Sequence, residues 1–370
     1  MLPYLYVVLK ALIKNCHLKF NIPKYLDSAS TTKVDTRVLE VMLPYFQEIF
    51  GNASANHTFG KKAKLAIEKA RQQVANIINC NANEITFTSG ATEAINFALK
   101  GYAEFNTDKG NKIITLKTEH KAVLATCDYL ETKGYEITYL DTDENGVIYL
   151  ENLKKEIDNN TVLVAIMHVN NETGIIQPIK NIGEICNENK VPFFCDATQA
   201  VGKIEVDVEK NHIDMLCFSG HKLNGPKGVG VLYKRGNINL TPLIHGGGQE
   251  KNLRGGTYNT PLIVGLGEAC EIAKKELKIN YTNLLDKRSE IEEYYEKNNI
   301  GKVNFKHVTK APHIISITLN NFEAEEYLMI KAKEFAASTG SACNAEIIEI
   351  SHVLKALKIE KKNKIIRISI

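Results

Sequence analysis

Short apolar runs alternate with stretches of helical periodicity over the first two thirds of the chain, and this alternation constrains the fold most. The runs have the length of buried strands, and the segments between them place apolar residues at helical spacing. The expected strands are residues 84–88, 112–116, 135–140, 161–167, 191–195, 214–218 and 229–233. The expected helices around them are residues 59–78, 93–100, 120–132, 150–157 and 181–189. Such an alternation predicts an α/β fold in which helices cover a mainly parallel sheet.

The pattern changes after Pro261, and this change marks the expected domain boundary. Two long helical stretches, residues 262–277 and 283–297, come before a mixed region with strands at 313–319 and 365–370. A chain of 370 residues is also too long for one small core, which favours a large domain with a smaller one. The predicted parts are an N-terminal extension of residues 1–24, a large domain of residues 33–260, and a small domain of residues 25–32 and 261–370.

The N-terminal region gives fewer clues. Residues 1–24 contain no acidic residue and include an apolar stretch at 2–9, without the basic start and small-residue end of a secretory signal. Two interpretations stay open: a targeting or docking arm, and an added helix on the small domain. After a short strand and turn in residues 25–32, Asp35 is expected to cap a helix that runs to Ile49.

Composition excludes several classes of function. The formal net charge is +3, with acids and bases spread along the chain, so nothing indicates a nucleic-acid-binding surface. No apolar run is long enough to cross a bilayer. The eight cysteines show no CxxC pair and no zinc-ligand spacing, and several lie in apolar runs. This usage is typical of a reducing compartment, so we expect the cytoplasm, with an organelle matrix as the alternative.

Lys222 lies in a glycine-rich connection between two expected strands. Glycines at 220, 225, 228 and 230, together with Pro226, predict a tight turn. A lysine fixed on such a turn can lose its hydration, which lowers the pKa of its amine. The neutral amine is then a nucleophile toward a carbonyl cofactor. Most lysines are simply solvated, however, so the other motifs must decide.

Three other positions are candidate site residues, although each also has a structural explanation. Gly90-Ala91-Thr92 opens a helix directly after a strand, and N–H groups at such a helix start bind phosphate. Asp196 ends an apolar strand at the edge where α/β sheets bind ligands, but an acid there can equally cap a helix. Cys343 follows small residues in an expected exposed loop, where a cysteine is often merely exposed.

A series of motifs in a fixed order resembles one enzyme family. The motifs are Tyr25-Leu26-Asp27, Thr88-Ser89-Gly90-Ala91-Thr92-Glu93, Thr118-Glu119-His120-Lys121-Ala122-Val123, His168-Val169-Asn170-Asn171-Glu172-Thr173-Gly174, Asp196-Ala197-Thr198-Gln199, Ser219-Gly220-His221-Lys222, His245-Gly246-Gly247-Gly248-Gln249-Glu250 and Gly340-Ser341-Ala342-Cys343. From Tyr25 to its C-terminus the chain resembles the cysteine desulfurases of the NifS/IscS type, which are class V aminotransferases. The resemblance implies a homodimeric transferase of fold type I, with a mainly parallel seven-stranded sheet in the large domain and a smaller α+β domain.

The resemblance implies pyridoxal 5'-phosphate (PLP) as the cofactor and assigns residues to its parts. Lys222 holds the aldehyde, Asp196 keeps the ring nitrogen protonated, and Gln199 bonds the ring hydroxyl. His120, which could otherwise be a surface histidine at a helix start, stacks on the ring and moves protons for the substrate thiol. The implied phosphate ligands are Ala91, Thr92, Ser219 and His221, with Thr257 reaching the phosphate from the other subunit.

The implied substrate is L-cysteine. Cys343 matches the nucleophile, whose thiolate takes the substrate sulfur as a persulfide and leaves L-alanine. Asn171 matches a residue beside the cofactor and the substrate carboxylate, and Arg367 matches the arginine that binds this carboxylate. Arg367 lies in the last expected strand, and terminal strands fray.

The implied role is sulfur supply for iron–sulfur cluster assembly or tRNA thiolation, with a sulfur acceptor or iron–sulfur scaffold protein as the partner. Around Cys343 the chain departs from the family pattern at Thr339 and at Ala345-Glu346, which leaves the partner and any transient iron–sulfur ligation by Cys343 open. The alternatives are another class V activity, such as selenocysteine lyase or an aminotransferase, and an inactive scaffold. The presence of the lysine, aspartate, histidine and cysteine named above favours an active desulfurase.

Overall fold

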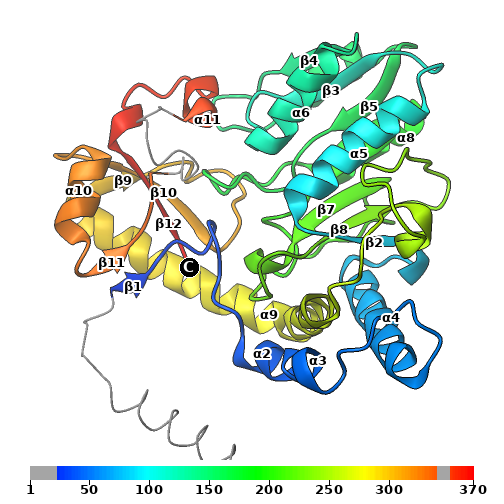
Figure 1. Ribbon diagram of the computed structural model, residues 1–370. Coiled ribbons are helices and arrows are strands. Elements are labelled where there is room, and N and C mark those ends of the chain that lie inside the picture. The colour runs from blue at the N-terminus through cyan, green and yellow to red at the C-terminus, as the bar shows by residue number, and fades with distance from the viewer. Residues whose placement is uncertain (1–22, 340–350) are drawn as a thin grey trace, which may run out of the picture.

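The computed structural model of the chain describes residues 23–339 and 351–370 (Figure 1). Of the expected N-terminal extension, residues 1–22 lie outside the described residues. The remainder is an α/β structure, as the sequence predicts.

A seven-stranded sheet forms the centre of the larger part, in the order β2-β8-β7-β6-β5-β3-β4. All pairs from β7 to β4 are parallel, whereas β8 runs antiparallel to both of its neighbours. Apart from the edge strand β4, these strands are almost wholly buried, which explains their continuous apolar sequences. The strands are β2 (Ile85–Thr88), β3 (Lys112–Leu116), β4 (Glu136–Leu140), β5 (Thr161–Ala165), β6 (Phe193–Asp196), β7 (Met215–Ser219) and β8 (Gly230–Lys234).

Helices cover both faces of this sheet (Figure 1). Alternate residues of each strand point to opposite faces, so that Phe193 and Cys195 join one apolar cluster and Phe194 joins the other. The first cluster contains residues of α4 and α8, and the second contains residues of α5 and α6. The helices of this part are α4 (Thr58–Ile78), α5 (Ala91–Phe105), α6 (Lys121–Glu131), α7 (Leu150–Glu156) and α8 (Ile179–Glu188).

The helix expected to run from Asp35 to Ile49 is two helices. Asp35 does cap the first, α2 (Thr36–Met42), by accepting a hydrogen bond from the backbone N–H of Arg37. The second, α3 (Pro44–Gln47), starts at a proline. Proline has no N–H and a fixed φ, which suit the first position of a helix and interrupt the interior of one.

The two helical stretches expected after Pro261 are one helix, α9 (Thr260–Lys297), 38 residues long. Its first half packs on the larger part, where a Cβ on Gly267 would lie 2.6 Å from the Cα of Ala70 in α4. Near its end, Tyr295 belongs to the separate apolar cluster of the smaller part. The apolar periodicity fades at residues 278–283 because the helix passes between the two parts, with Ile279 exposed, and not because it breaks.

The smaller part is built on the three-stranded antiparallel sheet β12-β10-β9 and the short parallel pair β1-β11. The strand predictions near 313–319 and 365–370 agree with β10 and β12. Because α9 contributes to both cores, the division of the chain into domains stays a prediction. The elements are β1 (Lys24–Tyr25), β9 (Gly301–Val303), β10 (Ile314–Leu319), α10 (Ala324–Lys331), β11 (Phe335–Ala336), α11 (His352–Ala356) and β12 (Ile365–Ser369).

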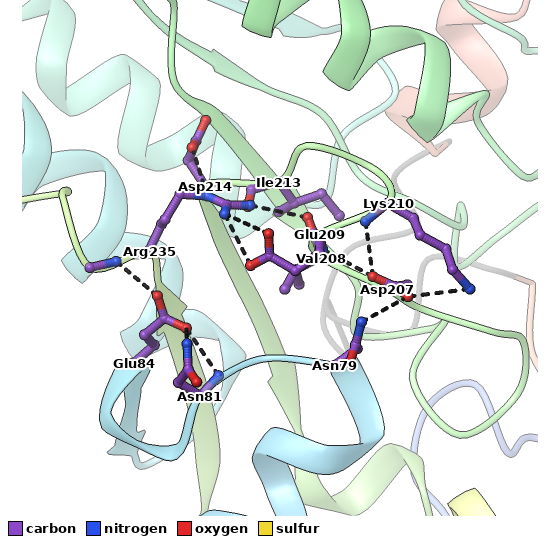
Figure 2. Close-up of polar contacts among 11 residues, drawn as sticks. Asn79, Asn81, Glu84, Asp207, Val208, Glu209, Lys210, Ile213, Asp214 and Arg235 are labelled. Atoms are coloured by element: carbon purple, nitrogen blue, oxygen red, sulfur yellow. Dashed lines mark hydrogen bonds and ion pairs between the residues drawn. The ribbon is translucent and has the colours of Figure 1, made fainter.

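A polar network closes the edge of the large sheet at which its parallel strands begin (Figure 2). Arg235 donates hydrogen bonds to the carboxylate of Glu209 at 2.9 Å and to the carbonyl of Ile213 at 3.0 Å. Glu84 accepts a bond from the backbone N–H of Gly236 at 2.9 Å. Arg235 is thus paired with Glu209, and these contacts tie the strand ends together, while the opposite edge forms a cavity. Within the described ranges, no helix has the length and apolar character needed to span a membrane.

Candidate active site

A cavity of about 590 Å³ lies at the edge of the sheet where its parallel strands end. It gathers side chains that are far apart in the sequence, including most of the residues predicted above. Those that line it are Ala91, Thr92, His120, Asn171, Asp196, Gln199, Ser219, His221, Lys222 and Arg367. Thr257 is exposed and does not line the cavity, and Cys343 lies outside the described residues.

Lys222 enters the cavity from a single 3-10 turn, η2 (Gly220–Lys222), that follows β7 directly. Its Nζ atom donates hydrogen bonds to the backbone oxygens of Ala29 and Ser30, both at 2.6 Å. The segment after β1 therefore forms one wall of the site and meets the amine with carbonyl dipoles. The sequence analysis missed this wall because it contributes backbone atoms, which leave no side-chain signature.

The start of α5 forms one end of the cavity. Its N-cap residue, Gly90, provides no side-chain hydrogen bond, so the first N–H groups of the helix can bind an anion. Strand β8 passes very close to this point: a Cβ on Gly230 would lie 2.6 Å from the Cα of Gly90. The sequence needs glycine at position 230 to allow this approach.

Two polar side chains after β7 lie at the same end. The Oγ atom of Ser219 is 3.5 Å from the place of a Cβ on Gly90, which puts its hydroxyl beside the start of α5. His221 Nδ1 is 3.1 Å from Thr31 Oγ1. Burial, with the nearby charges of Lys222 and Lys227, lowers the pKa of His221 to about 4, so this imidazole is neutral near pH 7.

Asp196 and Gln199 lie deeper in the cavity, at the end of β6. Asp196 is 6% exposed, and its Oδ1 atom accepts a hydrogen bond from the N–H of Thr198 at 2.9 Å. The side-chain amide of Gln199 donates to the carbonyl of Ala29 at 2.8 Å, and its oxygen lies 3.3 Å from Nε2 of His313. His313, which sequence reasoning did not identify, fixes the orientation of Gln199 from β10's side of the site.

His120 is the N-cap of α6, as expected from its place at a helix start. Its Nδ1 atom accepts a hydrogen bond from the N–H of Ala122 at 3.1 Å, so the proton of the neutral ring resides on Nε2. Burial lowers the pKa of His120, an effect that Asp196 opposes and Lys222 reinforces. The ring is thus neutral near pH 7 and presents an N–H donor.

Arg367 comes from β12, whose backbone pairs with β10 along its length. The expected fraying of this last strand is wrong, because Arg367 also bridges to Ser338 and is only 3% exposed. Its Nη2 atom donates to Asp27 Oδ1 and to the hydroxyl of Ser30, both at 2.7 Å. Its Nη1 atom donates to the carbonyl of Asn171 at 2.9 Å, which brings these two predicted residues together. The pairing with Asp27 was not predicted.

The cavity therefore has three chemical regions. One end offers the helix N–H groups, a hydroxyl and a neutral imidazole, which suit a phosphate group. The carboxylate of Asp196 favours the protonated form of a ring nitrogen. A lysine amine, a second neutral imidazole and a guanidinium line the same cavity. This donor set fits the parts of PLP and an amino-acid substrate.

Comparisons with known proteins agree with this arrangement. The family model described as Aminotransferase class-V matches residues 24–370. Cysteine desulfurase IscS of Ehrlichia chaffeensis is 46% identical over 359 residues, which cover 93% of this chain and 84% of that protein. The mitosomal cysteine desulfurase of Encephalitozoon cuniculi is 46% identical over 338 residues, with 90% and 78% coverage. A solved structure described as SspA in complex with cysteine has a TM-score of 0.84 and 39% identity, and the match covers 94% of this chain and 98% of that one.

Proposed function

Because this chain belongs to the class V aminotransferases and, among them, to the cysteine desulfurases, we propose that it converts L-cysteine to L-alanine and transfers the sulfur to Cys343. The observation that carries the proposal is the single cavity that gathers Lys222, Asp196, His120 and Arg367 from four distant stretches of the chain. The name of the related cysteine-bound structure supports L-cysteine as the substrate.

The cofactor in this proposal is PLP. When bound, it supplies an aldehyde that bonds to amines and a ring that withdraws electrons from the substrate Cα. Of the residues that line the cavity, the first turn of α5 (Ala91 and Thr92), Ser219 and His221 would hold the phosphate, Asp196 the ring nitrogen, Gln199 the ring hydroxyl and Lys222 the aldehyde. His120, in the same cavity, would stack on the ring.

Lys222 then acts as the base that removes the proton from the substrate Cα. Its Nζ atom is held at the cavity wall by the carbonyls of Ala29 and Ser30, which restrict where the amine can point. Arg367 and Asn171 fix the α-carboxylate of the substrate, so that the Cα–H bond faces this amine. His120, which lines the same cavity, moves the proton of the substrate thiol.

Cys343 completes the reaction as a thiolate nucleophile. Its sulfur bonds to the sulfur of L-cysteine, the Cβ–S bond of the substrate breaks, and the bonding electrons stay with Cβ. Protons delivered to Cβ and Cα give L-alanine, while Cys343 retains a persulfide. The sulfur then passes to an acceptor or scaffold protein for iron–sulfur cluster assembly or tRNA thiolation.

The active form in this proposal is a homodimer. Thr257 is exposed, which leaves it available to the phosphate site of a second copy. The segment from α2 to the start of α4 also carries large exposed apolar side chains, and the rings of two of them, Phe50 and Phe59, lie 5.8 Å apart. Apolar side chains gathered on a surface are typical of protein interfaces. The apolar residues of this surface are Leu39, Leu43, Phe46, Phe50 and Phe59.

The proposal also places the protein in a reducing compartment, either the cytoplasm or an organelle matrix. The described cysteines are free thiols, and most of them are buried. One relative is named as a mitosomal protein, which favours the organelle alternative as much as the bacterial relatives favour the cytoplasm.

Incubation of the PLP-loaded protein with L-cysteine and a reductant tests the proposed function. Sulfide and alanine should appear in equal amounts. The Lys222→Ala variant should lose covalently held cofactor and all turnover. The Cys343→Ala variant should keep the yellow colour of bound PLP but release almost no sulfide or alanine.

Other products would contradict the proposal. A keto acid formed with amino-group transfer would indicate an aminotransferase, and turnover of selenocysteine alone would indicate a selenocysteine lyase. A PLP-loaded protein that turns over neither substrate would be an inactive scaffold. Wild-type rates in Cys343→Ala would exclude the persulfide step.

A further inference from the structure

Two consecutive residues at the start of α11, Ser351 and His352, reach across to the large sheet. The Oγ atom of Ser351 donates a hydrogen bond to Glu172 Oε2 and accepts one from the N–H of Leu354, which caps the helix. Nε2 of His352 lies 2.8 Å from the carbonyl oxygen of Glu119. Because a carbonyl oxygen only accepts, His352 carries its proton on Nε2.

The two partners of this pair are the immediate neighbours of predicted site residues. Glu119 precedes His120, and Glu172 follows Asn171. A hydrogen bond to the backbone of Glu119 acts one residue from the helix cap that sets the His120 ring. Glu172 lies one residue from the carbonyl that Arg367 contacts. The start of α11 therefore touches both loops that present substrate-facing groups (Figure 1 shows α11 beside the start of α6).

The same two loops are also bonded to each other. The side-chain oxygen of Asn170 accepts hydrogen bonds from the N–H groups of Glu172 and Thr173, at 2.9 and 3.0 Å. Its amide donates to the carbonyl of Thr118 at 2.9 Å. A displacement of either loop is therefore transmitted to the other, and α11 holds both from outside.

The carboxylate that accepts the bond from Ser351 is deeply buried. It belongs to Glu172, which is 7% exposed. A buried carboxyl group that loses its hydrogen-bond donor must either shift its position or stay unsatisfied. On the other side, α11 is itself anchored by its buried residues Val353 and Leu354. The contact thus joins two well-packed elements.

We propose that Ser351, His352 and Glu172 are positioning residues that hold His120 and Asn171 in the geometry that L-cysteine requires. The inference rests on the proposed function and adds residues that touch neither substrate nor cofactor. It predicts that some of these residues affect KM and others affect kcat. Glu172 and Ser351 act next to Asn171 and Arg367, which bind the carboxylate, so their loss raises KM. His352 acts next to His120, which moves protons, so its loss lowers kcat.

Kinetics of PLP-loaded variants test this division. Glu172→Ala should raise KM for L-cysteine about 10-fold or more, and His352→Ala should lower kcat by a similar factor, as supporting contacts commonly do. Glu172→Gln and His352→Gln keep an acceptor and a donor at the same places and should recover most of the loss. The effects of Ser351→Ala and Glu172→Ala on KM should not add, because both remove one bond.

Glu84→Ala is the matched control. Glu84 is a buried acid of 9% exposure that accepts backbone hydrogen bonds from Asn81 and Gly236 at the opposite edge of the sheet. Its loss should lower the melting temperature comparably and leave KM and kcat within about twofold of wild type. If Glu172→Ala and His352→Ala behave like this control, the positioning role is refuted.

Equilibrium binding of L-alanine, measured by calorimetry on the same proteins, separates failure of this inference from failure of the proposed function. Absence of sulfide and alanine in the wild type refutes the proposed function, and the binding data then decide the positioning role alone. Weaker alanine binding in Glu172→Ala, restored in Glu172→Gln, supports the role. Equal binding in all variants, or none in the wild type, overturns it.

Discussion

Replacing Gly230 by alanine tests whether the start of α5 forms the phosphate site. The added Cβ would lie 2.6 Å from the Cα of Gly90 and 2.7 Å from its carbonyl carbon, so the clash is with backbone that cannot rotate away. Carbon atoms in contact are normally about 3.5 Å apart or more, so β8 and the start of α5 must separate by about 1 Å. Overpacking of this kind typically costs about 1–3 kcal/mol.

The displacement falls on the N–H groups that would hold the phosphate. If about 1.4–2.8 kcal/mol of binding free energy is lost, the Kd for PLP rises about 10- to 100-fold. The measurement is a titration of the cofactor-free variant with PLP, followed by absorbance. The melting temperature of the cofactor-free protein, measured in parallel, reports how much of the strain remains without the ligand.

Gly236→Ala provides the matched control just beyond the other end of β8. A Cβ there meets only Glu84 Oε1, at 3.7 Å, which is an ordinary contact. This variant should bind PLP with the wild-type Kd. The reasoning is refuted if Gly230→Ala binds PLP as tightly as wild type, or if Gly236→Ala weakens binding equally.

Three further predictions concern the assembly, the acid limb and a buried ion pair. The active protein should sediment as a dimer, and Thr257→Ala should weaken PLP binding without dissociating the dimer. A fully active monomer would contradict this. Burial lowers the pKa of His120, so its neutral form persists below the ordinary histidine pKa. The acid limb of the kcat/KM profile that depends on His120 should therefore lie below about pH 6.5, and it should vanish in His120→Gln. Glu250→Ala leaves Arg71 without its bidentate partner at 2.8 Å and should cost about 3–5 kcal/mol of stability, seen as a lower melting temperature; an unchanged one would show that Arg71 finds another anion.

The sequence predicts which residues gather in the cavity because parallel strands end at a common edge. His120, Asp196 and Lys222 each follow an expected strand, so a parallel sheet brings them to one side of the molecule without any knowledge of the strand order. The order itself does not follow from the sequence. Strand β8 runs antiparallel between β2 and β7, and its apolar run looks the same in either direction.

Side-chain patterns also cannot show that backbone atoms line a site, or that one helix passes from one core to another. The carbonyls of Ala29 and Ser30 bind Lys222 Nζ, but alanine and serine at these positions have no distinctive pattern. The middle of α9 loses its apolar periodicity between two cores, which in the sequence resembles a break. In both cases the missing information is which distant element lies alongside.

Arg367 shows how a motif can specify a charge without specifying its environment. The resemblance assigns the substrate carboxylate to this arginine, but Asp27, 340 residues away in sequence, already accepts a hydrogen bond from its Nη2 atom. A cation that is 3% exposed needs an anion in the resting protein as well as during binding. Asp27 meets that need, and it also holds the guanidinium in one orientation together with Ser30 and the carbonyl of Asn171. In the proposed function, the substrate carboxylate would share the arginine with Asp27. The contact that joins the N-terminal segment to the last strand is thus part of the fold and of the site.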